Sequence, residues 1–356
     1  MVKDVIKLGD VATYINGYAF KPEDRGEVGL PIIRIQDLTG NAYDLGFYDG
    51  EYPEKVEIND GDVLISWSAS LGVYVWNRGR ALLNQHIFKV VFDKVDIDKN
   101  YFVYAVRQKL VEMGMKTHGA TMKHIVKKDF DATLIPYPSL IEQEEIATNL
   151  NKVSRVIEAR KQELQLLDDL IKARFVEMFG DPIINSKNKD TQDLKDVLVL
   201  KAGDFTAASD ISEEPTETNI YPCYGGNGIR GYVADYNQEG EYSLVGRQGA
   251  LSGNVQYAEG KFRNTEHALL VTPIIEMNSI WLNQLLINLD LKRYQTGAAQ
   301  PGLSVKNLQE IPIIMVSIDE QNKYADFVHQ VDKSKFININ IIPEGGFYNG
   351  DKFYIS

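Results

Sequence analysis

Basic side chains gather in three segments of the sequence that hold almost no acid. Residues 107–128 contain six Lys and Arg against Glu112 alone, while residues 63–92 and 291–309 contain three each and no acid. The same segments carry Asn, Gln, His and Gly. Lys and Arg neutralise phosphates, Asn, Gln, Arg and His can bond to base edges, and Gly permits close backbone approach. This chemistry predicts nucleic-acid contact, with ordinary solvated loops as the alternative.

The predicted contact residues form two sets, one in each half of the chain, and each set needs a folded unit to bring it to one surface. The first set is Arg34, Arg78, Arg80, Gln85, His86, Lys116, His118, Lys123, His124, Lys127 and Lys128. The second set is Asn227, Arg230, Arg247, Gln248, Arg263, Asn264, His267, Arg293, Gln295, Gln300 and Lys306.

No motif for catalysis or for a bound cofactor accompanies these residues. The sequence has no G-x-x-x-x-G-K-[ST] phosphate loop, no G-x-G-x-x-G fingerprint and no G-x-S-x-G nucleophile turn. One cysteine, Cys223, and five histidines cannot supply the spacing of a zinc site. We therefore predict a protein without catalytic residues, metal or cofactor. A hydrolase whose site is dispersed along the chain is a weaker alternative.

The net charge of −12 argues against a polybasic protein that coats nucleic acid. The excess acid lies mostly in residues 191–318, which hold 9 basic and 15 acidic groups. We expect weak binding to DNA by the isolated chain. A bivalent sugar- or protein-binding scaffold is the alternative that this acidity favours.

The distribution of apolar residues predicts a protein of the cytoplasm. No apolar run approaches the roughly 20 residues that span a bilayer. The N-terminal segment has no signal-peptide core. We therefore expect no membrane contact.

The chain carries an internal repeat with a period near 180 residues. Five short matches recur in the same order, with offsets between 176 and 186. They pair residues 8–11 with 194–197, 61–64 with 240–245, 83–86 with 264–267, 117–120 with 295–298, and 135–143 with 311–321. The repeat predicts two similar globular units.

A long helix is predicted between the two repeats. Residues 142–178 contain no Gly and no Pro, and their apolar residues recur at heptad spacing. At 1.5 Å per residue such a helix is about 57 Å long and needs a partner helix along its seam. The seam consists of Leu150, Val153, Ile157, Leu164, Leu167, Ile171 and Met178.

The second repeat predicts a shorter helix at the equivalent place. Apolar spacing continues from Tyr324 to Val331 and then fails, because residues 336–341 alternate like a strand. We expect five segments: a globular domain at 1–140, a long spacer helix at 141–180, a second globular domain at 181–318, a short helix at 319–336 and an atypical tail at 337–356. Within the domains, residues 30–35 and 87–92 read as strands, and 101–114 and 279–294 as helices.

The order and duplication of these motifs resemble the specificity (S) subunit of type I restriction-modification systems. The segments that carry the resemblance are residues 7–11, 117–120, 135–138 with Glu142 and Gln143, 174–180, 221–228, 297–306, and Glu320 with Gln321.

The resemblance implies an α+β fold with two target-recognition domains and two long helices packed as an antiparallel coiled coil. It implies a non-catalytic subunit that binds double-stranded DNA at an asymmetric, bipartite sequence. It also implies partners: modification subunits that methylate adenine, and restriction subunits that cleave. The C-terminal part departs from the family pattern, because the second helix is about half the length of the first.

Overall fold

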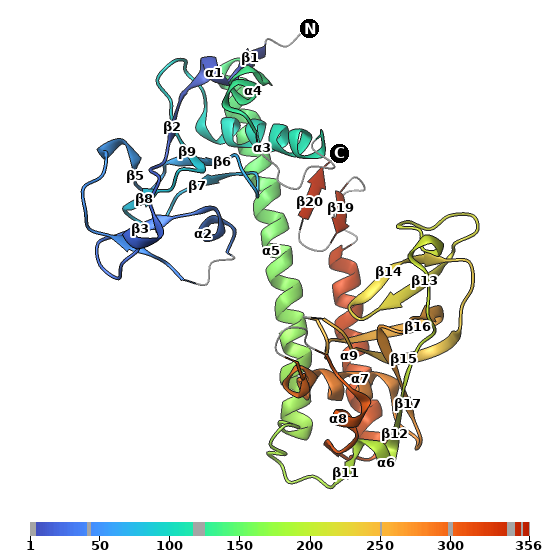
Figure 1. The fold of residues 1–356 in the computed structure, drawn as a ribbon. Helices are drawn as coiled ribbons and strands as arrows, with labels where there is room; N and C mark the ends of the chain where they lie inside the picture. Colours follow the sequence, from blue (N-terminus) through green and yellow to red (C-terminus); the bar gives the residue numbers. More distant parts are fainter. Residues whose placement is uncertain are drawn as a thin grey trace. The chain divides into compact units, whose positions relative to one another are not determined.

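The structure is a computed structural model that describes residues 5–40, 44–116, 125–249, 251–297, 302–339, 346–349 and 352–355. The chain forms two compact units, Met1–Ile157 and Glu158–Ser356, and each mixes helices with sheets (Figure 1). The predicted α+β fold with two similar units is confirmed. Within the described residues, no helix is both long and apolar enough to cross a membrane.

Unit 1 is built on two four-stranded sheets. Its elements are β1 (Val5–Lys7), α1 (Leu8–Val11), β2 (Thr13–Asn16), β3 (Leu30–Ile33), α2 (Ile35–Thr39), β4 (Phe47–Tyr48), β5 (Glu57–Ile58), β6 (Val63–Ser66), β7 (Gly72–Val75), β8 (Ala81–Leu83), β9 (Ile87–Val91), α3 (Lys99–Lys116), α4 (Lys127–Ala132), β10 (Leu134–Pro136) and the start of α5 (Leu140–Phe179), with 3-10 turns at Pro22–Asp24 and Glu54–Val56. The sheets have the orders β2-β9-β6-β7 and β4-β3-β8-β5, and β1 pairs with β10.

The core of unit 1 lies between α3 and the first sheet. Phe102, Val106 and Leu110 recur every four residues on α3, so they share one face of the helix. That face packs against buried residues of β6 and β9, including Ile65 and Phe88. Helix α3 covers the predicted helix at 101–114, and β9 ends one residue before the predicted end of the strand at 87–92.

Unit 2 is built on one six-stranded sheet of order β12-β17-β15-β16-β13-β14. Its elements are the end of α5, β11 (Thr191–Asp193), α6 (Leu194–Val197), β12 (Leu198–Ala202), β13 (Tyr221–Gly225), β14 (Gly228–Val233), β15 (Gln238–Gly246), β16 (Val255–Asn264), β17 (Ala268–Pro273), α7 (Ser279–Asn288), α8 (Val305–Gln309), β18 (Pro312–Ile314), α9 (Ile318–Ile339), β19 (Gly346–Asn349) and β20 (Lys352–Ile355), with 3-10 turns at Ala208–Asp210 and Leu291–Tyr294.

Within unit 2, the end of α5 packs against α9. The Tyr324 hydroxyl donates to the backbone carbonyl of Ile171 at 3.1 Å. Further along α9, Lys335 pairs with Asp168 on α5 at 2.7 Å. Because a later residue of α9 meets an earlier residue of α5, the two helices run antiparallel, as predicted.

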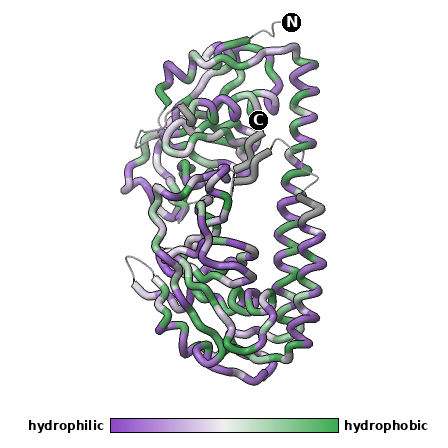
Figure 2. Tube along the Cα trace, turned by 90° about the vertical axis from the view of Figure 1, so that its right-hand side faces the viewer, coloured by the Kyte–Doolittle hydropathy of each residue, from purple (hydrophilic) through white to green (hydrophobic). Residues whose placement is uncertain are grey.

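The apolar stripe on α5 is wider than the predicted seam. Ile171 is buried, and Leu167 and Met178 are partly buried against the same core, but Phe175 and Phe179 are the most enclosed side chains of this stretch. The stripe contacts Trp281 of α7 as well as α9, so it follows the 3.6-residue period of a globular helix. Of the other seam residues, Val153 is exposed, and Leu150, Ile157 and Leu164 are half-buried. Figure 2 shows hydrophobic and hydrophilic residues alternating along this helix.

The second helix is indeed shorter, with 22 residues in α9 against 40 in α5. The strand-like reading of residues 336–341 was wrong, because α9 continues to Ile339. The alternation of Ile and Asn covers only a few residues, so it indicates a strand less strongly than the preceding apolar spacing indicates that the helix continues. The strands β19 and β20 form a hairpin further along the chain.

The internal repeat of the sequence is also seen in the side-chain hydrogen bonds at the starts of α5 and α9. Ser139 and Glu142 form a capping box before α5, and Ser317 and Glu320 form the same box before α9. The next residues, Gln143 and Gln321, are buried and accept from the backbone N–H of Asp98 and Asn278, both at 2.9 Å. The predicted match of Glu142-Gln143 with Glu320-Gln321 is therefore confirmed.

Replacing Ser317 with alanine is expected to lower the stability of the chain by about 1 kcal/mol, because the first turn of α9 loses its cap. Equilibrium denaturation of the full chain measures this. The matched control is Ser334→Ala, since among the described residues the Ser334 hydroxyl bonds to a carbonyl of its own helix, that of Gln330. Equal losses in both variants would contradict a capping role for Ser317.

Candidate nucleic-acid interface

Both units place polar loops at the same kind of sheet edge. In unit 1, β3 and β8 are parallel neighbours, and in unit 2 β13 and β16 are. Parallel strands end at one edge, so the loops that follow them meet there. The backbone N–H of Asn84 donates to the carbonyl of Ile33 at 3.1 Å, and that of Thr265 donates to the carbonyl of Tyr224 at 3.2 Å. These two bonds set the same backbone register in both units.

In unit 2 this edge brings together Arg247, Gln248 and His267. The Arg247 N–H donates to the carbonyl of His267 at 3.1 Å, and the His267 ring nitrogen Nδ1 lies 2.9 Å from Gln248 Oε1. Arg247 and Gln248 follow the end of β15, and His267 lies in the turn between β16 and β17. Gln248 is exposed and the other two are half-buried. Three of the predicted contact residues therefore form one cluster.

The close approach of three loops in this cluster depends on glycine. A Cβ placed on Gly246 would lie 2.1 Å from the carbonyl oxygen of Gly226, and one on Gly226 would lie 3.1 Å from that of His267. Side chains at these positions would push the β13–β14 turn away from Arg247. The turn carries Asn227, whose amide bonds to that of Asn254.

In unit 1 the equivalent turn carries Gln85 and His86, which are both exposed. The N–H of Trp67 points at the carbonyl of His86 at 3.5 Å, and the two rings lie 5.6 Å apart. The N–H of Ile125 then donates to the Trp67 carbonyl, as that of Leu303 does to the Arg247 carbonyl. Trp67 therefore occupies the position of Arg247. The sequence set omits Trp67, although the repeat offset of 180 residues would have found it.

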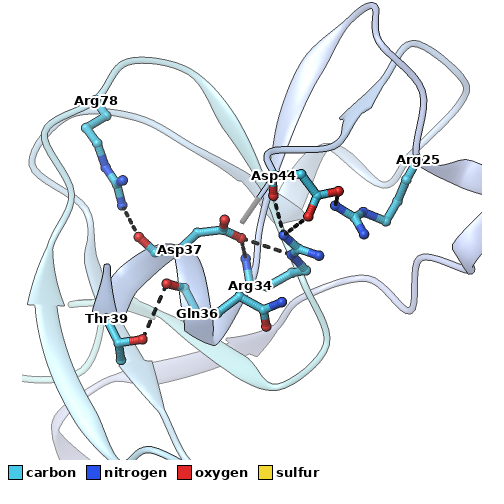
Figure 3. A network of polar contacts seen from close by, with 7 residues as sticks. All are labelled: Arg25, Arg34, Gln36, Asp37, Thr39, Asp44 and Arg78. Carbon is cyan, nitrogen blue, oxygen red and sulfur yellow. Dashed lines mark hydrogen bonds and ion pairs between the residues drawn. The ribbon is translucent and has the colours of Figure 1, made fainter. Parts of the chain in front are cut away.

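Arg34 and Arg78 are occupied by contacts within the protein (Figure 3). Arg34 Nε lies 3.1 Å from the Asp37 carboxylate, and its Nη2 donates to the backbone carbonyl of Asp44. Arg78 Nη2 donates to the backbone carbonyl of Asp37 at 3.0 Å, with its guanidinium over the ring of Trp76. The Arg34 side chain is only 15% exposed. We correct its predicted role from DNA contact to support of α2.

Four other predicted residues also have protein partners. Arg80 pairs with Glu57 and, through that hydrogen bond, lowers the pKa of the Glu57 carboxyl. Lys127 pairs with Asp131 at 2.8 Å, and Arg263 pairs with Asp235 at 2.8 Å. The Gln295 amide donates to the backbone carbonyl of Ser252. These groups are partly neutralised or held in place, so they are weaker candidates for contact with phosphate.

Asn264 cannot take its predicted role. Its side chain is 1% exposed, and its Nδ2 points at the carbonyl of Ala268 at 3.4 Å within the protein. The residue ends β16, and its amide holds the turn to β17. The predicted contact of Asn264 with DNA is therefore wrong, since an enclosed amide cannot reach a base.

The remaining predicted residues divide by what the structure describes. Lys128, Arg230, Arg293 and Lys306 are exposed and form no ion pair with the residues that the structure describes. The side chain of Lys116 and all of His118, Lys123, His124 and Gln300 lie outside the described residues. Within the described part of the chain, no group of three or more His, Cys, Asp or Glu side chains is placed to hold a metal ion.

Two similar α+β units, each with an amide and an imidazole side chain on loops at one sheet edge, define a duplicated recognition protein. The chain belongs to the family described as the type I restriction modification DNA specificity domain, whose model matches residues 3–168 and 186–344. The resemblance inferred from the sequence is confirmed.

The similarity of the chain to its relatives extends over most of its length. It is 33% identical to the type I restriction enzyme EcoprrI specificity subunit of Escherichia coli, over 92% of this chain and 87% of that protein. It is 28% identical to the EcoBI specificity subunit of the same organism, over 92% and 78%. The crystal structure of the S subunit of a type I restriction-modification system from M. genitalium matches with a TM-score of 0.57 at 17% identity, covering 95% of this chain and 91% of that one. This last match is a likeness of fold.

Proposed function

We propose that this chain is the DNA-recognition subunit of a type I restriction-modification complex. The observation that carries the proposal is the duplicated loop edge, because each unit offers its own polar side chains in the same backbone frame. Gln85 and His86 lie at the edge in unit 1, and Arg247, Gln248 and His267 lie there in unit 2. Two similar frames with different side chains suit an asymmetric target of two half-sites.

In this proposal the units read bases and leave the chemistry to partner subunits. Arg can bond in bidentate fashion to guanine, and Gln to adenine, in the major groove. Modification subunits methylate adenine in the target, and restriction subunits cleave DNA. The chain itself works in the cytoplasm as a non-catalytic subunit that sets where both partners act.

The acidity of the chain supports a division of DNA contacts among subunits. Glu266 lies 3.2 Å from His267 within the cluster, so the edge has little net positive charge. Non-specific affinity comes largely from phosphate neutralisation. We expect the isolated chain to bind DNA weakly and the assembled complex to bind it tightly.

Co-expression with a cognate modification subunit tests the proposal. Adenine methylation is mapped across the host genome with and without this chain. We expect a two-part methylated motif only when the chain is present. Methylation that is absent, or that does not depend on the chain, would contradict the proposal.

Lys128→Ala is expected to weaken DNA binding by the complex and to reduce the slope of log affinity against log salt by about 1. Lys128 is exposed on α4, next to a segment rich in basic residues. Binding titrations at several salt concentrations measure the slope. The control is Lys172→Ala, which removes an exposed cation from α5. A slope equal to that of the parent would exclude a phosphate contact at Lys128.

A further inference from the structure

In each unit an exposed amide side chain follows three residues after an equivalent backbone carbonyl of the sheet edge. The carbonyls of Ile33 and Tyr224 accept the equivalent backbone bonds from Asn84 and Thr265. Three residues beyond these carbonyls lie Gln36 on α2 and Asn227 on the β13–β14 turn. The local backbone differs, a helical turn in one unit and a strand connection in the other, yet both positions present a carboxamide to solvent.

α2 is held firmly although it has only five residues. At its start, the Arg34 N–H donates to the Asp37 carboxylate at 2.8 Å, and the Asp37 N–H donates to the Arg34 carbonyl at 3.0 Å. At the other side, Arg78 holds the Asp37 carbonyl. The Asp37 side chain is 3% exposed, so its charge relies on Arg34 for compensation. A helix fixed in this way holds the backbone of its outward residue in place.

Gln36 is that outward residue. It is exposed, and no hydrogen bond to its side-chain amide is recorded among the residues that the structure describes. In Figure 3 its carboxamide lies apart from the Arg34–Asp37–Arg78 contacts that fix the helix. A surface Gln is common, but this one is exposed while most polar side chains around it are engaged.

We propose that Gln36 is a specificity-determining residue that reads an adenine in the half-site bound by unit 1. The inference deepens the proposed function and rests on it. Gln Nε2 can donate to adenine N7 while Oε1 accepts from the adenine N6 amino group, a pairing that no other base offers in the major groove. Arg34 and Arg78 act as positioning residues, since they hold α2 and not the base.

The test is the methylated motif produced with each variant in the co-expression system. Gln36→Ala is expected to relax one adenine position of one half-site, with discrimination there falling about tenfold or more. The other half-site is expected to stay unchanged. Arg78→Ala is expected to relax the same position to a smaller degree. Gln108→Ala, which removes another exposed amide from unit 1, is the control and should leave the motif unchanged.

Three results would overturn the inference. One is an unchanged motif in Gln36→Ala. Another is relaxation at a base that is not adenine, or in the half-site that Arg247→Ala alters. The third is loss of all methylation by a variant whose thermal midpoint equals that of the parent, because a single base contact cannot account for it. If the parent chain itself yields no bipartite motif, the proposed function fails instead.

Discussion

Replacing Tyr324 with alanine is expected to lower the free energy of unfolding by about 3–5 kcal/mol, the usual cost of removing a large buried aromatic side chain. Tyr324 is fully enclosed, and its ring meets those of Phe175 and Phe179 at 5.5 and 5.6 Å in edge-to-face geometry. The substitution leaves a cavity where α5 and α9 pack. Equilibrium denaturation of the full chain measures the loss.

Tyr324→Phe separates the ring from the hydroxyl. Burial raises the pKa of Tyr324, so the hydroxyl keeps its proton and remains a donor to the Ile171 carbonyl. Removing that one bond is expected to cost about 1 kcal/mol. A loss below about 1 kcal/mol in Tyr324→Ala would contradict the account of the α5–α9 contact, since the cavity alone should exceed it.

Arg247→Ala is expected to weaken binding of the assembled complex to its target by about 1–3 kcal/mol, which is roughly 5- to 150-fold. Its backbone is fixed by His267 and Leu303, and no ion pair of its guanidinium is recorded among the described residues. The side chain is therefore available to a base or a phosphate. Binding titrations with the target duplex measure the change.

A base contact and a phosphate contact at Arg247 give different results. Loss of a base contact relaxes one position of the half-site, whereas loss of a phosphate contact weakens all sequences alike. Lys195→Ala is the control, because it removes a cation of unit 2 that pairs with Asp193 near α6. Affinity and motif both equal to those of the parent would show that Arg247 does not touch DNA.

The sequence predicted the framework because the framework is duplicated. The Glu-Gln pair that follows each domain recurs since both glutamates cap a helix and both glutamines bond to a loop N–H. Such contacts are local or hold the same elements in both units. The same residue types therefore recur at equivalent positions of the two repeats, and this recurrence can be detected in a single sequence.

The site was predicted less well because its contacts depend on residues far apart in the chain. Arg78 reaches a carbonyl 41 positions away, and Arg80 a carboxylate 23 positions away. Asn264 and Gln248 both carry a carboxamide, but Asn264 is buried and Gln248 is exposed, and this difference follows from strand packing. The place of Gln36, which we propose to read a base, follows from a backbone bond in the folded unit that the sequence does not show.

Exchange of one recognition unit tests the central claim most directly. Residues 198–314 are replaced by the equivalent segment of a relative with a different target, and adenine methylation is mapped with the same modification subunit. We predict that one half of the bipartite motif changes to that of the donor while the other half stays as in the parent. A motif that is unchanged, or that changes in both halves, would contradict the claim that each unit reads its own half-site.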